Sequence, residues 1–361
     1  MGMSLGDSVR VTLFGESHGA GMGAVIDGCP PGLPLGADDL QPDLDRRRPG
    51  KDRLSSARKE PDIPRIVSGV SEGLTTGTPI AILFENRDAK PKAYSALKDL
   101  YRPSHADLTY DLKYGHRAWS GGGRASARET VARVAAGAIA KKLLHAEFGT
   151  LCVAWVDRAA GIQATVDRHR VTPAEVASSG SIQCPDPEAA PLMAAAIEAA
   201  RKDGDTVGGV IGAVVHDAPA GLGDPVFEKL DARLAHAMLG LPAAKAFEIG
   251  SGFAGVDMRG SAHNDPFVPG PDGAIRTLTN RSGGVQGGIS NGMEITFRVG
   301  FKPVATHFKP QDTVTRTGEA TSFQASGRHD PCVLPRAVVI VEAMTALVIC
   351  DAWLRHRGQT G

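Results

Sequence analysis

The sequence has few aromatic residues, no excess of charge of either sign and few cysteines. Aromatic residues make up 5% of its 361 residues, whereas 44 are glycine and 24 are proline. This composition is typical of a loop-rich globular enzyme and excludes a coiled coil or a disordered chain. Lysine and arginine number 40, as do aspartate and glutamate, so the formal net charge is zero. No global positive field attracts nucleic acid or a membrane surface.

The chain also lacks the cysteine patterns of a disulfide framework or a metal site. Its five cysteines are scattered, with no C-x-x-C pair and no metal-ligand spacing, which indicates reduced thiols in a reducing compartment and no metal. The N-terminal stretch has no apolar signal-peptide segment, and Gly6 breaks the myristoylation pattern. Glu342 and Asp351 interrupt the longest apolar run, at 337–354, which argues against a membrane span. We expect a soluble, cytoplasmic protein.

The stretch GGGRASARET at 121–130 combines a glycine turn with a helix start. Its glycines let the backbone approach a ligand closely. Ser126 and Glu129 have the S-x-x-E spacing of a capping box, which predicts that a helix begins here. Arg124 and Arg128 flank that start, and two guanidiniums beside helix N–H groups suit an anion such as phosphate. The alternative is a plain helix cap with two solvated arginines.

Two loops of the first half each place a histidine among polar residues. The turn GESHG at 15–19 follows a strand expected at 9–14, and its flanking glycines expose the side chains between them. His105 lies beside Arg102 on a proline-marked loop. Because histidine can hold or pass a proton near neutral pH, both loops are candidate acid–base sites.

A basic cluster ends the helix expected at 38–48. It comprises RRR at 46–48 followed by Arg53 and Arg58. Such a cluster is either a solvated face or, in a chain without net charge, a local site for an anionic substrate.

The second half has its own polar segments. A glycine-rich loop at 280–292 can line a flat ligand with backbone groups, and 302–306 adds a lysine and a threonine. The motif GRHDPC at 327–332 places Arg, His and Asp on one loop. Asp330 either starts the helix that follows Pro331 or belongs to a functional site.

The chain repeats itself in three places that keep the same order. Residues 212–222 match 23–33, residues 285–295 match 70–80, and Arg336 opens an apolar segment as Arg128 does. Three matches in register indicate a duplication.

This duplication predicts the fold class, α+β. Each half supplies short, glycine-punctuated strands, which favour antiparallel sheets, and one long helix that is apolar on most faces and therefore buried between layers. We predict a single domain over 1–361, a β–α–β sandwich with an internal pseudo-two-fold repeat. Its halves cover about 9–148 and 206–355, and a peripheral segment at about 150–205 carries no recognisable chemistry.

Five motifs together resemble those of the chorismate synthase family over about 9–355. They are GESHG at 15–19, DLDRRRPG at 43–50, GGGRASARET at 121–130, GGISNG at 287–292 and GRHDPC at 327–332. The resemblance implies a lyase of the shikimate pathway, in the biosynthesis of aromatic amino acids. Such an enzyme removes phosphate from 5-enolpyruvylshikimate 3-phosphate by 1,4-elimination to give chorismate. It also implies a β–α–β sandwich, a homotetramer and a requirement for reduced FMN, which some members regenerate with NADPH.

The resemblance also assigns residues. His18 would lie at the leaving phosphate, His105 near the flavin pyrimidine edge and Asp330 near flavin N5 in a proton relay, with Ser17 and Ser126 ordering the network. The substrate or NADP would be bound by Arg47, Arg53, Arg102 and Arg128. FMN would be bound by Arg124, Ala125, Ser126, Pro242, Ala243, Gly287, Lys302, Pro303, Val304, Ala305, Thr306 and Arg328.

Several positions depart from the family pattern. Ser104 replaces the glycine common before His105, Ser120 stands where arginine is frequent, and His116 stands where apolar residues are common. Ala125, Pro242, Val304 and Ala305 replace polar side chains, which affects individual flavin hydrogen bonds more than the activity. No role follows for His116 or His329.

Two other functions compete with this interpretation. A flavoprotein oxidoreductase could use the same glycine loops, but no G-x-G-x-x-G follows a strand and opens a helix. A phosphate- or RNA-binding module could use the arginines alone, but it leaves His18, His105 and Asp330 without a role.

Overall fold

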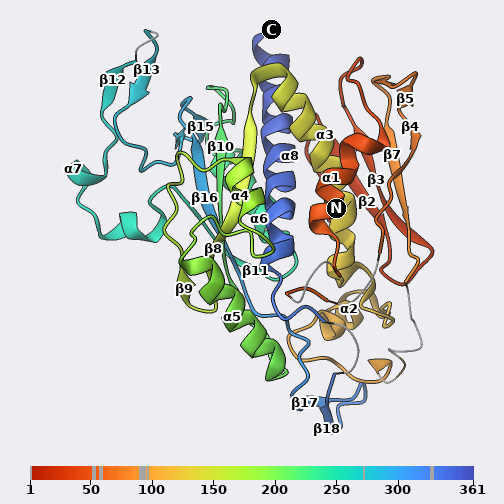
Figure 1. The fold of residues 1–361 in the computed structure, drawn as a ribbon. Helices are drawn as coiled ribbons and strands as arrows, with labels where there is room; N and C mark the ends of the chain where they lie inside the picture. Colours follow the sequence, from red (N-terminus) through yellow and green to blue (C-terminus); the bar gives the residue numbers. More distant parts are fainter. Residues whose placement is uncertain are drawn as a thin grey trace.

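The predicted β–α–β layering is confirmed by the computed structural model, which describes residues 2–50, 54–56, 60–88, 95, 97–270, 273–325 and 329–361. Two long helices, α3 (Thr130–Phe148) and α8 (Leu334–Thr360), lie side by side between two five-stranded antiparallel sheets (Figure 1). One cluster of buried apolar side chains runs through all the layers, from Val9 to Trp353.

Each sheet has the strand that carries the repeated glycine motif at its centre. The first sheet has the order β1-β2-β3-β7-β4, formed by Ser4–Leu5, Arg10–Gly15, Gly21–Asp27, Ile80–Glu85 and Arg65–Ser68. The second has the order β11-β16-β10-β8-β9, formed by Ala244–Ile249, Ile295–Phe301, Gly209–His216, Leu151–Ala159 and Ile162–Gln163. Along β7, Ile80, Ile82 and Phe84 alternate with more exposed residues, as expected for a strand with one face on the core.

The two sheet orders agree when one of them is read backwards, so the structure contains the predicted repeat. Strand β3 corresponds to β10, β7 to β16, and α3 to α8. Strand β8 then takes the place of β2, beside the central strand, and pairs with β10 from residue 151 to residue 159.

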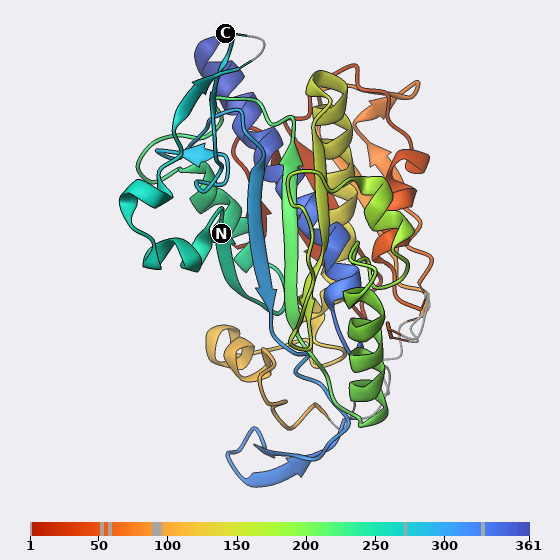
Figure 2. The same ribbon diagram turned by 60° about the vertical axis from the view of Figure 1, so that its left-hand side comes forward.

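The prediction that residues 150–205 are peripheral is therefore wrong for their first part. Strand β8 is buried along most of its length, and it opens the second half at residue 151 rather than 206. Only the later part, with α4 (Pro173–Ser178) and α5 (Ala189–Lys202), is an addition, and α5 lies along the outside of the layers (Figure 2). The repeat motifs did not reveal β8 because it shares none with β2.

The remaining elements are short and surround the layers. The helices are α1 (Ala37–Arg47), α2 (Asp107–Tyr114), α6 (Leu230–Leu239) and α7 (Gly260–His263), with 3₁₀ turns at Gly123–Ala125, Ala127–Glu129 and Gly252–Asp257. Two-stranded pairs are formed by β5–β6 (Val70–Ser71, Leu74–Thr75), β12–β13 (Phe267–Pro269, Ile275–Thr277), β14–β15 (Val285–Gln286, Ile289–Ser290) and β17–β18 (Gln311–Val314, Ala320–Phe323).

The central helices pack closely because small residues line their contact. A Cβ placed on Gly137 of α3 would lie 2.3 Å from the Cβ of Ala343 in α8. Helix α8 is long and apolar enough to cross a membrane, yet 89% of its most apolar window is buried inside the protein. Its composition is thus explained by its central position.

A buried ion cluster ties α1 to both central helices. Glu342 of α8 accepts hydrogen bonds from Arg46 at 2.6 and 2.8 Å and from Lys141 of α3 at 3.1 Å, and Lys141 also reaches Asp43 at 2.9 Å. The cluster fixes the end of α1, and the next residue, Arg47, enters the site described below.

Candidate active site

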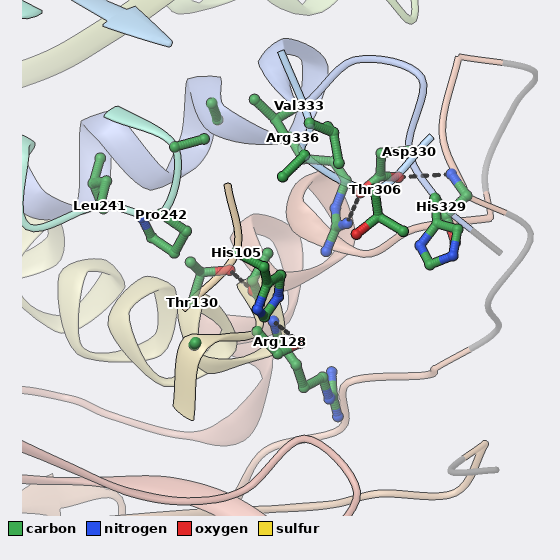
Figure 3. A pocket seen from close by; sticks show the side chains of 18 of the residues that line it. His105, Arg128, Thr130, Leu241, Pro242, Thr306, His329, Asp330, Val333 and Arg336 are labelled. Carbon is green, nitrogen blue, oxygen red and sulfur yellow. Dashed lines mark hydrogen bonds and ion pairs between the residues drawn. The ribbon is translucent and has the colours of Figure 1, made fainter. Parts of the chain in front are cut away.

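A cavity of about 320 Å³ opens at the end of the layers where α3 and α8 both begin. Its lining comes from both halves of the repeat, with Arg128 and Thr130 on one side and Asp330, Val333 and Arg336 on the other (Figure 3). Because helix N-termini carry partial positive charge and free N–H groups, two of them at one cavity favour an anion.

The glycine turn before α3 makes room for both candidate histidines. Gly121 and Gly122 have φ values of +66° and +84°, a region that side chains rarely adopt. A Cβ on Gly121 would lie 2.0 Å from Nδ1 of His18, and one on Gly122 would lie 2.9 Å from Cε1 of His105. The triple glycine therefore serves the close approach of two imidazole rings, and both rings line the cavity.

Ser17 orients His18. Its hydroxyl donates to the carbonyl of Gly121 at 3.3 Å and lies 3.0 Å from Nδ1 of His18. The two contacts hold the imidazole of His18 through its Nδ1 edge.

His105 is held by an ion pair on the loop that precedes α2. Arg102 donates from Nε and Nη2 to Asp107 at 2.8 Å each, and its Nη2 lies 3.1 Å from Nδ1 of His105. The same Nδ1 lies 3.4 Å from Oδ1 of Asp107, so the ion pair fixes the ring of His105 through its Nδ1 edge. Burial, aided by the charges of Arg102 and Lys302, lowers the pKa of His105 although Asp107 opposes the shift.

Asp62 joins two arginines on the floor of the cavity. One carboxylate oxygen binds Arg47 and the other binds Arg128, and all three side chains are at least 97% buried. Burial alone would raise the pKa of Asp62, but the two guanidiniums outweigh it and keep that pKa below its ordinary value. Burial lowers the pKa of Arg47 to about 10, so Arg47 remains charged at neutral pH.

Both arginines keep donors that the described part of the chain leaves without hydrogen bonds. These are Nε of Arg47 and Nη2 of Arg128, each shielded from solvent. Arg128 also donates to Asn86 at 3.1 Å and lies 3.9 Å from Glu60. A buried donor without a partner costs about 1–3 kcal/mol, which is tolerated where a ligand completes the site.

Asp330 is held in place on the opposite wall. It accepts from Arg336 at 2.5 Å and from the backbone N–H of Ser56 at 2.7 Å. Arg336 also donates to the carbonyl of Arg47 at 3.0 Å. Helix α8 begins four residues later, at Leu334, with Val333 as its N-cap, so Asp330 does not cap it.

Apolar side chains make up much of the remaining lining. They are those of Leu241, Pro242, Ala243, Phe301, Val304, Ala305, Val333, Ala337 and Ile340. Lys302 and Thr306 also line the cavity, and burial together with the nearby Lys245 lowers the pKa of Lys302. The cavity thus combines apolar groups with cationic ones.

Most of the predicted site residues line this one cavity. They are His18, Arg47, Arg102, His105, Ala125, Ser126, Arg128, Pro242, Ala243, Lys302, Val304, Ala305, Thr306 and Asp330. Ser17 lies fully buried behind His18. Arg53 and Arg328 lie outside the described residues.

Three predicted flavin-binding residues are not among those that line the central cavity. Gly287 lies at the turn of the β14–β15 hairpin, next to Gly288, which accepts from Leu230 in α6. Pro303 is adjacent to the cavity residues 302 and 304 but is not in its lining. Arg124 donates to the carbonyls of Phe14 and Gly15 and lines a second cavity.

That second cavity, of about 500 Å³, lies directly behind the two histidines. His18 and His105 belong to the walls of both cavities, together with Ala106 and Ala125. His116, Ser120 and Tyr110 also line the second one. Two of the positions that depart from the family pattern, 116 and 120, thus line the same cavity.

The capping-box prediction is wrong in its hydrogen bonds. Ser126 accepts from the N–H of Arg128 and caps a short 3₁₀ turn, while Glu129 binds Arg133 at 2.9 Å. Helix α3 itself begins at Thr130. The intervening 3₁₀ turn contains Arg128, whose side chain binds Asp62.

The sequence analysis missed Glu60, Asp62 and Arg336. Glu60 and Asp62 lie in the segment EPDIP at 60–64, where two prolines restrict the backbone. Carboxylates beside prolines, close to an arginine cluster, are the signal that could have revealed them. Arg336 was noticed only as a repeat of Arg128.

The comparisons with known proteins agree on one family. The family model for chorismate synthase matches residues 9–354. The chain is 55% identical to the chorismate synthase of Acaryochloris marina over 99% of this chain and 98% of that protein. It is 56% identical to that of Thermosynechococcus vestitus, over 99% of both chains.

A solved structure supports the same assignment. A crystal structure of chorismate synthase superposes with a TM-score of 0.74 at 30% sequence identity, covering 97% of this chain and 92% of that one. With a whole-length family match, relatives at 55% identity or more and a shared fold, the chain belongs to the chorismate synthase family of lyases.

Proposed function

We propose that this protein converts 5-enolpyruvylshikimate 3-phosphate to chorismate by 1,4-elimination of phosphate, with reduced FMN, as a step of the shikimate pathway. The observation that carries the proposal is the convergence of Arg47, Arg128, His18, His105 and Asp330 on one cavity. In this reaction the carbon–oxygen bond to phosphate breaks, and a proton leaves the carbon at the far end of the allylic system.

Arg47 and Arg128 bind the leaving phosphate in this proposal. Each has a buried N–H group without a hydrogen-bond partner in the described chain, and both stand near the start of α3. Guanidinium groups hold phosphate through charge-assisted hydrogen bonds that strengthen as negative charge accumulates on the leaving oxygens. Arg102, the third cation, is already engaged with Asp107 and acts chiefly by orienting His105.

His18 gives a proton to the departing phosphate. Its Nδ1 is engaged by Ser17, so the transferable proton is on Nε2. His105 is neutral at pH 7 because its pKa is lowered, and it would contact the flavin as an uncharged ring. Asp330, fixed by Arg336 and Ser56, would take part in the relay that carries away the proton leaving the substrate.

The lining of the cavity fits a flavin. Its apolar side chains suit the face of an isoalloxazine ring, and Lys302, Thr306 and Ser126 would offer polar groups to the edge of the ring. Ala125, Pro242, Ala243, Val304 and Ala305 would contact the ring through backbone and apolar atoms. Reduced FMN, when bound, supplies the electron-rich ring that the elimination requires, although substrate and product have the same oxidation state.

We also propose that the enzyme works in the cytoplasm as a homotetramer. In support of an assembly, the projecting segment between β11 and β14 exposes Phe253, Val256, Phe267, Ile275 and Leu278, each at least 68% accessible (Figure 1). Exposed apolar groups of this size typically mark protein–protein contacts. Light scattering at several protein concentrations measures the oligomer number directly.

An anaerobic assay tests the proposed activity. Chorismate and phosphate are followed after the enzyme is mixed with 5-enolpyruvylshikimate 3-phosphate and chemically reduced FMN. His18→Ala and His105→Ala should each lower turnover by at least ~100-fold, the scale of one acid–base group. His145→Ala, at an exposed position of α3, is the matched control and should retain full turnover. Near-normal turnover in both site variants would refute these roles.

A second arm tests whether the protein reduces its own flavin. NADPH replaces the chemical reductant, with oxidised FMN present. Chorismate formation in this arm identifies an intrinsic reductase, and its absence with activity in the first arm identifies an enzyme that depends on external reduction.

A further inference from the structure

Asp62 has an unusual place in the site. Asp62 is 1% exposed, and its backbone adopts a φ of +50°. Each of its two carboxylate oxygens contacts one guanidinium. Left-handed backbone is rare for residues other than glycine, although aspartate tolerates it better than most. Flanking Pro61 and Pro64 limit the freedom of the segment, which therefore delivers this carboxylate in one fixed orientation.

The two arginines need such a partner. Both are at least 96% buried, and their mutual repulsion helps to lower the pKa of Arg47. A pair of buried like charges is strongly unfavourable unless a counter-ion lies between them. Asp62 supplies that charge while leaving one N–H group of each arginine free of hydrogen bonds within the described residues.

Glu60, the other buried carboxylate nearby, has a different task. Its carboxylate accepts the backbone N–H groups of Arg87 and Asp88 at 3.1 and 3.2 Å and stays 3.9 Å from Arg128. Glu60 thus fixes the loop after β7, whereas Asp62 is the carboxylate among the described residues that hydrogen-bonds both guanidiniums.

We propose that Asp62 is a positioning residue, which holds Arg47 and Arg128 in one fixed arrangement for the phosphate of the substrate. The two guanidiniums and the carboxylate together carry a net charge of +1. This inference rests on the proposed function for the identity of that phosphate. Asp62 does not touch the substrate; it acts by setting the orientation and the charge of the two groups that do. A displacement of about 1 Å in such groups can lower turnover by ~100-fold.

The test uses Asp62→Asn, which keeps the shape of the side chain and removes its charge. The two arginines then lack a counter-ion, and a small anion can take its place. Inorganic phosphate should raise the melting temperature of Asp62→Asn by at least ~2 °C more than it raises that of the wild-type enzyme, at matched ionic strength. Turnover should fall at least ~10-fold.

Glu342→Gln is the matched control. Glu342 is also a buried carboxylate bound to two cations, but it lies in the helix layer away from the cavity. Its removal should lower the melting temperature without any extra stabilisation by phosphate. Equal phosphate responses in Asp62→Asn and Glu342→Gln, or turnover of Asp62→Asn within twofold of wild type, would overturn the proposal.

Asp62→Glu keeps the test decisive if Asp62→Asn does not fold. It retains the charge but moves the carboxylate by one methylene, so its phosphate response should match wild type while turnover falls at least ~5-fold; unchanged turnover contradicts positioning. If the wild-type enzyme forms no chorismate but Asp62→Asn shows the extra phosphate response, the proposed reaction fails while the pairing of the two arginines stands.

Discussion

Replacing Gly121 by alanine should disable His18 while leaving the fold intact. A Cβ at this position would lie 2.0 Å from Nδ1 of His18, whereas van der Waals contact needs about 3.5 Å. The imidazole must therefore move by roughly 1.5 Å, which is enough to lower turnover by ~100-fold, equivalent to about 2.7 kcal/mol in the activation barrier. The motion also removes the contact between His18 and Ser17.

Alanine at position 121 also strains the left-handed backbone, and this effect must be separated from the displacement of His18. Gly115 provides the control. Gly115 has a φ of +67°, close to the +66° of Gly121, but a Cβ there meets nothing within 4 Å. Each alanine variant should lose about 1–2 kcal/mol of stability from the left-handed backbone. Only Gly121→Ala should lose turnover, measured anaerobically with reduced FMN and alongside urea denaturation of both variants. Equal turnover in the two variants would refute the argument that the glycine serves His18.

Three further outcomes are expected. Gly137→Ala should lower the free energy of unfolding by at least ~2 kcal/mol because its Cβ would lie 2.3 Å from that of Ala343. Without this clash the substitution would stabilise α3, because alanine is the better helix former. A gain of stability in urea denaturation would therefore show that α3 and α8 do not touch there. Ser104→Gly should stabilise the protein by about 0.5 kcal/mol, since Ser104 has a φ of +56° and glycine relieves that strain; a lower melting temperature would contradict it. The folded-state pKa of His105 lies below its ordinary 6.5, so the unfolded chain binds more protons, and the stability that His105 contributes is complete above pH 6.5 and lost as the pH falls below it. Wild type should therefore lose stability on acidification more steeply than His105→Gln, and an NMR titration of His105 with a midpoint above 6.5 would contradict the assignment.

The layers of the fold were predictable because the chain carries the same signals twice. Short glycine-punctuated strands and two helices apolar on most faces predict a helix layer between sheets, and α8 ends only six residues beyond the predicted apolar run. The start of the second half was missed because β8 shares its position with β2 but none of its residues. Pairing across a sheet, unlike a repeated motif, leaves no mark in the local sequence.

Site residues were predictable from the sequence where their neighbours along the chain are unusual. His18 lies in a turn flanked by glycines and His105 follows a proline by two residues, and both line the cavity. Asp62 and Arg336 did not, because their roles depend on partners 66 and 289 residues away, Arg128 and Arg47. Gly287 matched a family motif, yet its hairpin packs on α6; sequence similarity alone does not give that placement.

We propose that one cavity brings a phosphorylated substrate and a reduced flavin together without net oxidation. The stoichiometry of anaerobic turnover tests this, with chorismate, phosphate and reduced FMN quantified in the same reaction. We expect equal amounts of chorismate and phosphate, many per enzyme, with the reduced FMN unchanged at the end. Oxidation of one FMN for each product, or release of phosphate without chorismate, would contradict it.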